Sequence, residues 1–370
     1  MTLKPTPSGS RASSTHANAP RRPVSPSLGA MAEPTLPEQV TKLYDLISGY
    51  HATHLLEIGR ELGVWEAITG QPGITSDALA SRIRSDPFYT DVLVRTAFAF
   101  ELVERDGDGW RMAPHFDQIL GTPSATFYLG GAARTHQIVG EDYASYAQRF
   151  REGSRVPYQE HSKAFMEAVA SGLQALPRIF TELVLPRLPT LKARFEAGAR
   201  VLDVGCGAGW ALVQLAERFP KVTCVGVDNE PYSIELANRL ITERGLRDRC
   251  VARLTDAQRL AEDGAFDVAT SFLVIHEIDP KDKAAAFAAV ARALKPGGQF
   301  VIFDETYPTT DEELRRMPAR FAALAQWFEL TWGNRLNTKP ELAALCAGAG
   351  LTLADETTFS RFYIGVAEKR

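Results

Sequence analysis

Two acidic residues and a glycine-rich run have the types and spacing of a nucleotide-type site. Asp203 lies two residues before Gly205, and Gly205–Gly209 reads Gly-Cys-Gly-Ala-Gly. Glycines in such a turn let the backbone approach a ligand closely. Asp228 lies 23 positions after Gly205, where an acid at the end of the next strand can accept hydrogen bonds from ribose hydroxyls. The pattern predicts a site for a ligand that contains a nucleoside.

The spacing of the glycines separates this site from a dinucleotide site. Counted from Gly205, the third glycine comes one residue earlier than in the GxGxxG pattern of dinucleotide-binding enzymes. Asp203 has no function in holding a pyrophosphate, whereas a carboxylate there can accept hydrogen bonds from a cationic amino group. A cofactor that carries an amino acid accounts for both features.

The elements that must position these residues alternate as in a parallel α/β sheet. Buried strands are expected at 200–204, 222–227, 249–254, 266–272 and 299–304, with amphipathic helices between them. Ligands of such sheets bind at the carboxyl ends of the strands. Both the glycine run and Asp228 follow strand ends, so they are expected to lie together.

In this order and spacing, the motifs resemble those of class I S-adenosylmethionine-dependent methyltransferases. The resemblance covers about residues 199–308 and is carried by Val201–Gly209, Asp228, Asp256 and the turn Leu294–Gly298. It implies a Rossmann-like α/β sheet with a C-terminal antiparallel hairpin, for which the alternating segments 352–357 and 362–368 are suited. It also implies S-adenosylmethionine as the cofactor.

The resemblance assigns a function to individual residues. The cofactor-binding residues that it implies are Asp203, Gly205, Cys206, Gly207, Asp228, Asn229, Asp256, Ala257 and Phe272. Asp203 and the backbone of Gly205–Gly207 would hold the methionine portion. Asp228 would bind both ribose hydroxyls, and Asp256 would accept a hydrogen bond from the adenine amino group.

His276 is the candidate catalytic base. The resembling O-methyltransferases have a His-Asp-Trp stretch after the fourth strand, and this chain has His276-Glu277-Ile278 there. Histidine titrates near neutral pH, which suits removal of a proton from an acceptor hydroxyl. Two interpretations stay open. His276 is either the base or a pocket-lining or hydrogen-bonded structural residue, and the methyl acceptor is either oxygen, as we expect, or nitrogen or carbon, where no base is required.

The N-terminal part has a different pattern. Helices at 77–84 and 86–102, followed by two short strands within 103–112, are typical of a winged helix. The segment 86–104 holds four acidic residues against Arg95 alone, and DNA would repel it. We therefore expect a dimerisation or substrate-covering module, and hence a homodimer. A winged-helix transcriptional regulator that senses the cofactor is the alternative.

Composition excludes several classes of protein. The 370 residues are 45% hydrophobic and 23% charged, with a net charge of −4, as in an ordinary globular protein. No apolar run reaches the roughly 18 residues of a membrane span, and four cysteines without CxxC spacing indicate neither a zinc site nor disulfides. A cytoplasmic enzyme with a small-molecule methyl acceptor, and without a metal, fits these features.

Four regions are expected along the chain. Residues 1–37 form a Pro- and Ser-rich disordered tail, within which Met31 is the expected natural start. A winged-helix or dimerisation domain follows at 38–125, a helical linker and pocket cover at 126–198, and the S-adenosylmethionine-binding domain at 199–370. Aromatic residues of 126–198, and of a helix inserted at 311–336, either pack in the core or line the pocket.

Overall fold

The structure is a computed structural model that describes residues 33–370. Most of the predicted tail, residues 1–32 with Met31, lies outside the described residues. By its internal packing the chain divides into two units, residues 1–48 and 49–370, and the boundary falls inside helix α1 (Leu36–Glu61).

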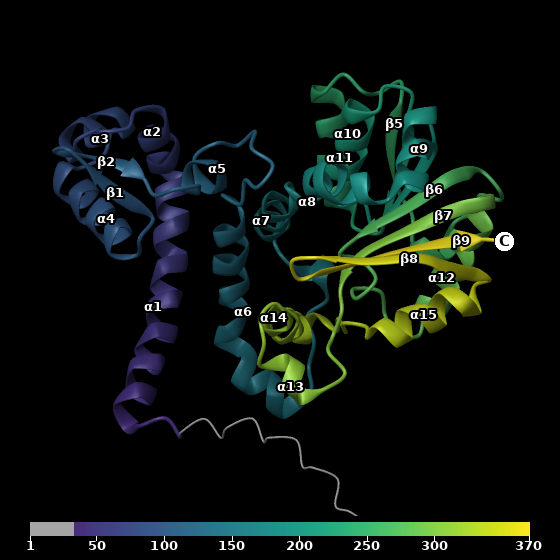
Figure 1. The fold of residues 1–370 in the computed structure, drawn as a ribbon. Coiled ribbons are helices and arrows are strands. Elements are labelled where there is room, and N and C mark those ends of the chain that lie inside the picture. The colour runs from purple at the N-terminus through teal and green to yellow at the C-terminus, as the bar shows by residue number, and fades with distance from the viewer. Residues whose placement is uncertain (1–32) are drawn as a thin grey trace, which may run out of the picture. The chain divides into compact units, whose positions relative to one another are not determined.

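A seven-stranded sheet lies in the second unit (Figure 1). Its strands are β3 (Arg200–Val204), β4 (Thr223–Asp228), β5 (Cys250–Leu254), β6 (Phe266–Phe272), β7 (Leu294–Glu305), β8 (Leu351–Phe359) and β9 (Phe362–Lys369). They are ordered β5-β4-β3-β6-β7-β9-β8. Strands β3 to β7 are parallel, and β9 is antiparallel to β7 and β8. The predicted parallel strands and C-terminal hairpin are confirmed.

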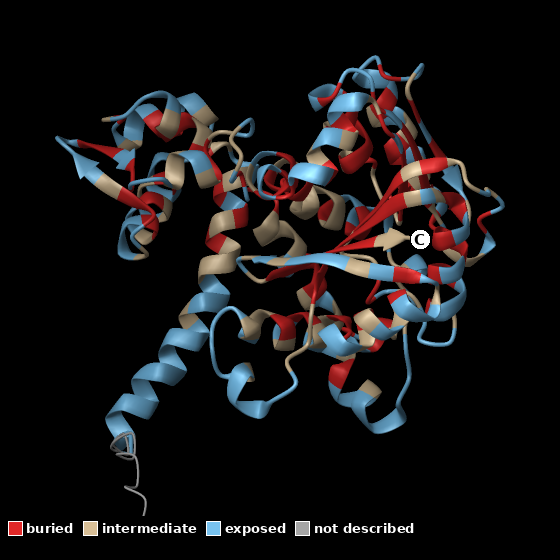
Figure 2. Cartoon of the chain, turned by 45° about the vertical axis from the view of Figure 1, so that its right-hand side comes forward, coloured by how far each residue is buried: buried red, intermediate tan, exposed pale blue. Residues whose placement is uncertain are grey.

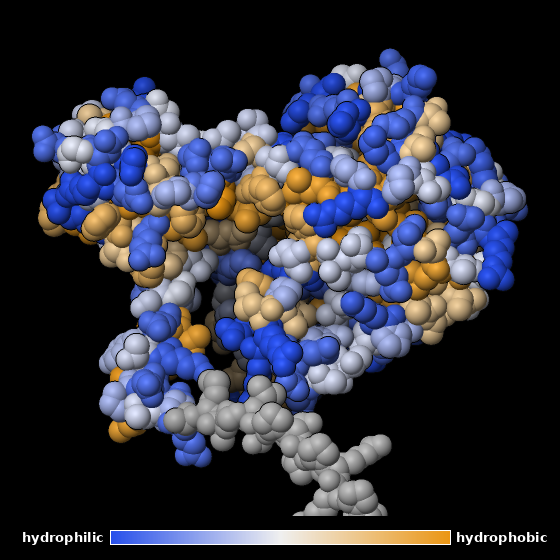
Figure 3. Space-filling model, in the orientation of Figure 1, coloured by the Kyte–Doolittle hydropathy of each residue, from blue (hydrophilic) through white to orange (hydrophobic). Residues whose placement is uncertain are grey.

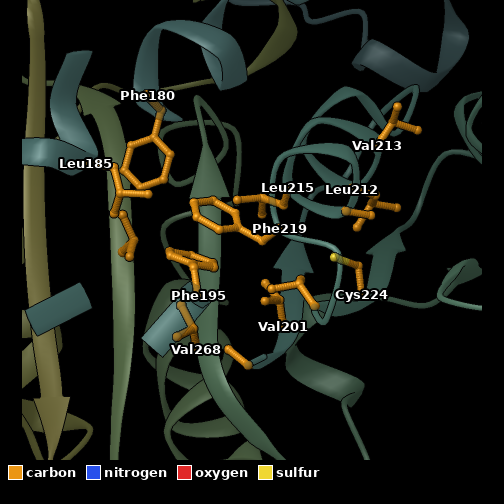
Figure 4. Close-up of a cluster of buried hydrophobic side chains, with 14 of the residues drawn as sticks. Phe180, Leu185, Phe195, Val201, Leu212, Val213, Leu215, Phe219, Cys224 and Val268 are labelled. Atoms are coloured by element: carbon orange, nitrogen blue, oxygen red, sulfur yellow. The ribbon is translucent and has the colours of Figure 1, made fainter. Parts of the chain in front are cut away.

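Helices cover both faces of this sheet. One face carries α9 (Pro189–Ala197), α10 (Trp210–Arg218) and α11 (Pro231–Glu243), and the other carries α12 (Lys283–Ala293) and α15 (Lys339–Gly348). Val201 packs with Leu212 in one hydrophobic cluster (Figure 4), whereas the next residue, Leu202, packs with Phe287 in the other. Successive side chains of a strand point to opposite faces of the sheet. Because helices cover each face, both sets of side chains are buried (Figure 2).

Short helices and a hairpin precede the sheet. They are α2 (Val64–Gly70), α3 (Ser76–Ile83), α4 (Pro87–Ala99), β1 (Val103–Asp106), β2 (Gly109–Met112) and α5 (Phe116–Leu120). The Thr75 side chain accepts a hydrogen bond from the backbone N–H of Ala78, and that of Asp86 accepts one from Tyr89. These caps explain where α3 and α4 begin. The two helices and the antiparallel hairpin that the sequence predicts are confirmed.

The linker and the segment 311–336 each contain several helical segments. The linker holds α6 (Ala132–Glu152), η1 (Tyr158–Glu160), α7 (Lys163–Leu173), α8 (Leu176–Ile179), η2 (Phe180–Val184) and η3 (Leu185–Arg187). The helix expected within 311–336 is instead divided into α13 (Asp311–Leu314), α14 (Ala319–Glu329) and η5 (Leu330–Trp332). Pro318 stands between α13 and α14, and its ring cannot continue a helix.

Within residues 33–370, no helix combines the length and the apolar character that crossing a lipid bilayer requires.

Candidate functional site

A cavity of about 440 Å³ lies at the carboxyl ends of β3, β4 and β6. Strand β3 has β4 on one side and β6 on the other, so the strand order reverses here, at the place where open α/β sheets bind ligands. The opposite wall comes from η1, α7, α8 and residues 332–334.

The turn between β3 and α10 brings bare backbone to this cavity. Gly205 has a φ of +67°, and a Cβ there would lie 2.4 Å from the Val274 side chain. Gly207 has a φ of +48° and nothing within 4 Å of the place of its Cβ. The close approach of Val274 therefore requires glycine at position 205, whereas the backbone at Gly207 is open to a ligand.

Asp228 is held in a fixed orientation at the end of β4. Its two carboxylate oxygens accept hydrogen bonds from the backbone N–H groups of Gly207 and Glu230, both at 2.9 Å. Burial raises the pKa of Asp228, and these hydrogen bonds oppose the rise. Each carboxylate oxygen has a second lone pair, so Asp228 can still accept from the two hydroxyls of a ribose.

Asp203 is a buried acid without a cationic partner. Its side chain is 2% exposed and accepts a hydrogen bond of 2.7 Å from the Thr270 hydroxyl. Burial raises the pKa of Asp203 to about 7, and the charge of Asp228 adds to the rise. No Lys or Arg of residues 33–370 offsets it. A cationic group in the cavity would stabilise the carboxylate, so this site fits an amino-acid-bearing nucleoside.

The structure brings most of the predicted cofactor residues together. Those that line the cavity are Asp203, Gly205, Cys206, Gly207, Asp228, Asn229, Ala257 and Phe272. Asp256 does not line it: its carboxylate lies 3.2 Å from Arg259 Nε, while its neighbours Thr255 and Ala257 face the cavity.

His276 lies beside the cavity but does not line it. The ring is enclosed between two acids: Nδ1 lies 2.5 Å from Asp304 Oδ1 at the end of β7, and Nε2 lies 3.2 Å from Glu329 Oε2 at the end of α14. The residue is 4% exposed. Burial alone would lower the pKa of His276, but the charges and hydrogen bonds of Asp304 and Glu329 outweigh it and raise the pKa well above 6.5.

Glu277, unlike its neighbour His276, lines the cavity, as do Asp279 and Asp282 farther along the chain. Its side chain is exposed to the cavity, although protein surrounds it. This enclosure raises the pKa of Glu277 to about 8, against the opposing charge of His276. In the sequence, Glu277 stands out only as the neighbour of His276. The motif places both His276 and Glu277 after β6, but it does not show which of the two side chains faces the ligand.

Two aromatic side chains form the wall opposite the sheet. Tyr158 and Trp332 line the cavity, with their ring centroids 6.2 Å apart, edge to face. Trp332 Nε1 donates a hydrogen bond of 2.8 Å to Asp142, which fixes the indole. The other aromatic and apolar residues considered as pocket walls do not line this cavity: Tyr143, Tyr146, Phe150, Phe165, Phe180, Phe321, Leu324, Trp327 and Phe328.

Among the described residues, no group of three or more His, Cys, Asp or Glu side chains could hold a metal ion.

Comparison with known proteins agrees with this geometry. A family profile described as "Methyltransferase domain" matches residues 201–298. The ubiquinone biosynthesis O-methyltransferase of Xanthomonas axonopodis pv. citri is 32% identical over 179 residues, which are 46% of this chain and 70% of that protein. The aclacinomycin 10-hydroxylase RdmB of Streptomyces purpurascens is 32% identical over 60% of this chain and 56% of that protein.

Other matches are partial or show the fold alone. The chain spans only about a third of the length of the first two curated relatives, 33% and 38%. The structure of human N-acetylserotonin methyltransferase has a TM-score of 0.70 and 17% identity, and the match covers 92% of this chain and 99% of that one. With its motif series on the expected sheet and most of a 32% identical O-methyltransferase covered, the chain belongs to the class I S-adenosylmethionine-dependent methyltransferases.

Proposed function

We propose that this protein transfers a methyl group from S-adenosylmethionine to an oxygen atom of a small molecule. The observation that carries the proposal is one cavity with two unlike sets of lining residues. Asp203, the open backbone at Gly207 and Asp228 line it from the sheet, and Tyr158 and Trp332 line it from η1 and η5. The first set suits the cofactor, and the second suits a flat, apolar acceptor.

The residues of the cavity would bind and orient the two reactants. Bound there, S-adenosylmethionine supplies an activated methyl group on a sulfonium. Asp203 would face its ammonium group, Asp228 its ribose, and the segment near Ala257 its adenine. Because the methyl group is already activated, the protein contributes mainly alignment, together with removal of a proton when the acceptor is a hydroxyl.

The proposal extends to the N-terminal elements, the oligomeric state and the location of the protein. The elements α2 to β2 would form a winged-helix module that serves in a homodimer rather than on DNA, in a cytoplasmic protein. Exposed apolar residues on α1 support self-association: Leu43, Tyr44, Ile47 and Tyr50 are each 46–64% exposed. Figure 3 shows hydrophobic surface (orange) at places along this helix. Apolar area of this kind marks an interface more often than free surface. The proposed regions remain 1–37, 38–125, 126–198 and 199–370.

Methyl-labelled S-adenosylmethionine tests the proposal. The full chain is incubated with it and, in separate mixtures, with simple phenols, primary amines and stabilised carbon acids, and the products are identified by mass spectrometry. Label on a phenolic oxygen supports O-methylation. Label on nitrogen or carbon instead would replace it with the corresponding alternative. Tight cofactor binding without any transfer would contradict the activity itself.

A further inference from the structure

We infer that Glu277, rather than His276, takes the proton from the acceptor hydroxyl, and that His276 is a positioning residue that holds α14 against the sheet. The inference rests on the proposed function. It is based on two observations. Glu277 lines the cavity, whereas both ring nitrogens of His276 already lie against carboxylates.

His276 has no free nitrogen with which to accept a proton. Nδ1 meets Asp304 and Nε2 meets Glu329, and a ring that donates from both nitrogens is an imidazolium. Its backbone is fixed too: its N–H donates to Asp304 Oδ2 at 3.3 Å, and its carbonyl accepts from the N–H of Arg335 at 3.0 Å. To act as a base, the ring would first have to lose a proton that two carboxylates stabilise.

The contacts of His276 instead join distant elements. Asp304 is the last residue but one of β7, and Glu329 is the last residue of α14. Glu329 also accepts a hydrogen bond of 3.2 Å from Asn334 Nδ2. Asn334 and the nearby Trp332 line the cavity. The imidazolium therefore fixes the segment that carries part of the acceptor wall.

Glu277 has the opposite surroundings. It lines the cavity together with Asp228, Phe272 and Tyr158, and within residues 33–370 its carboxylate has no hydrogen bond or ion pair. A carboxylate exposed to the cavity and free of partners can accept a proton from a bound hydroxyl.

The electrostatic surroundings of Glu277 favour its action as a base. Desolvation by the surrounding protein and the charges of the nearby carboxylates raise the pKa of Glu277 to about 8, while His276 opposes the rise. The titratable groups that face it are His276, Asp228, Asp304, Glu329 and Tyr158. A carboxylate with a raised pKa is a stronger base than an ordinary one, and closer to the pKa of about 10 of a phenol such as tyrosine.

The step balances without a further reactant. The acceptor O–H proton passes to the Glu277 carboxylate, and the oxygen's electron pair forms the new O–CH₃ bond. The bond between that carbon and the sulfonium sulfur breaks, and its electron pair stays on sulfur. The products are a methyl ether, a neutral thioether and a protonated Glu277, which returns its proton to the water of the cavity.

Two phenols test the inference in the full-length protein. 4-Methylphenol is neutral at the assay pH and needs a base, whereas 4-nitrophenol is already ionised and does not. We expect Glu277→Gln to lower kcat by about 10²–10⁴-fold with 4-methylphenol and by less than about tenfold with 4-nitrophenol. Glu235→Gln, the same change at an exposed residue of α11 outside the cavity, should leave both rates unchanged.

The pH profile distinguishes the two candidate bases. In the wild type, kcat/KM for 4-methylphenol should rise with pH through an apparent pKa at or below about 8, because a bound cation favours the carboxylate. Glu277→Gln should remove this rise, and Glu277→Asp should keep it at a lower rate. His276→Gln should also keep it, while raising the KM of the acceptor. A rise that is lost in His276→Gln and kept in Glu277→Gln would make His276 the base.

Calorimetry with S-adenosylhomocysteine separates failure of this inference from failure of the proposed function. If the wild type does not bind the compound, the proposed function is wrong. If the wild type binds it and methylates 4-methylphenol, and Glu277→Gln does so equally fast, only the inference is wrong. If it binds the compound and methylates neither phenol, a phenolic acceptor and the proton transfer to Glu277 are both excluded.

Discussion

The raised pKa of Asp203 makes ligand binding depend on pH. A buried carboxyl with a pKa of about 7 is partly protonated at neutral pH, although a cationic ligand requires the ionised form. Binding must therefore release a proton below about pH 7, because the carboxylate is stabilised only once the ligand's charge lies beside it.

We expect the affinity for S-adenosylhomocysteine, which carries the ammonium group, to rise with pH up to about 7 and then to level off. Titrations in buffers of different ionisation enthalpy should show proton release at pH 6 that disappears in Asp203→Asn. Equal affinity at pH 6 and pH 8 in the wild type would contradict an interaction between Asp203 and the ligand's cationic group.

Gly205 is a second residue for which the structure predicts the effect of a substitution. A Cβ there would lie 2.4 Å from Val274 and would also force a side chain into a φ of +67°. Gly245→Ala is the matched control, since Gly245 has a φ of +66° and nothing within 4 Å.

We expect Gly245→Ala to cost about 1 kcal/mol, the backbone contribution alone, and Gly205→Ala to cost more and to weaken binding of S-adenosylhomocysteine. Urea unfolding and calorimetry measure the two effects. Equal losses of stability in the two variants, with binding intact, would show that the contact with Val274 is unimportant.

Among the elements, α14 is attached to the sheet by buried charge. Asp304 is fully buried and Glu329 is 7% exposed, and His276 between them offsets both carboxylates. Removing one member of a buried ion pair leaves the partner's charge uncompensated, which costs about 3–5 kcal/mol.

We therefore expect His276→Gln to lower the free energy of unfolding by about 3–5 kcal/mol near pH 7, measured by urea denaturation. His115→Gln is the control, because His115 is an exposed histidine outside this cluster. A loss no larger than that of the control would mean that the imidazolium does not stabilise the attachment of α14.

Sequence predicted the elements well where local signals decide them. Val201 and Leu202 face opposite hydrophobic clusters because strand side chains alternate, and the cap at Asp86 marks the start of α4. The orientation of His276 and Glu277 could not be predicted in this way. Asp304 and Glu329, which hold the histidine, come from β7 and α14, and only the assembled fold brings them to it. Asp256 stays a prediction: its neighbours Thr255 and Ala257 line the cavity, and its own carboxylate lies against Arg259.

At the scale of the whole molecule, the exposed apolar residues of α1 are the feature that the single chain leaves unexplained. Leu43 is 56% exposed and Ile47 is 46% exposed, and they lie one helical turn apart on the same face. Burying such a face in a homodimer would remove this apolar area from water.

We expect light scattering to show a dimer for the wild type and a shift toward monomer for Leu43→Glu with Ile47→Glu. Lys42→Glu, a charge change at another exposed position of the same helix, should leave the dimer intact. A wild type that is monomeric at tens of micromolar would contradict the homodimer.

The most direct test of the account is calorimetric titration of S-adenosylhomocysteine into the full-length wild type and Asp228→Ala. The account predicts saturable binding of one molecule per chain, weakened about 10–100-fold by the substitution, as expected for the loss of charge-assisted hydrogen bonds worth about 1.5–3 kcal/mol. Folded wild-type protein that gives no binding heat, or an Asp228→Ala variant that binds as tightly as the wild type, would contradict the assignment of this cavity to the cofactor.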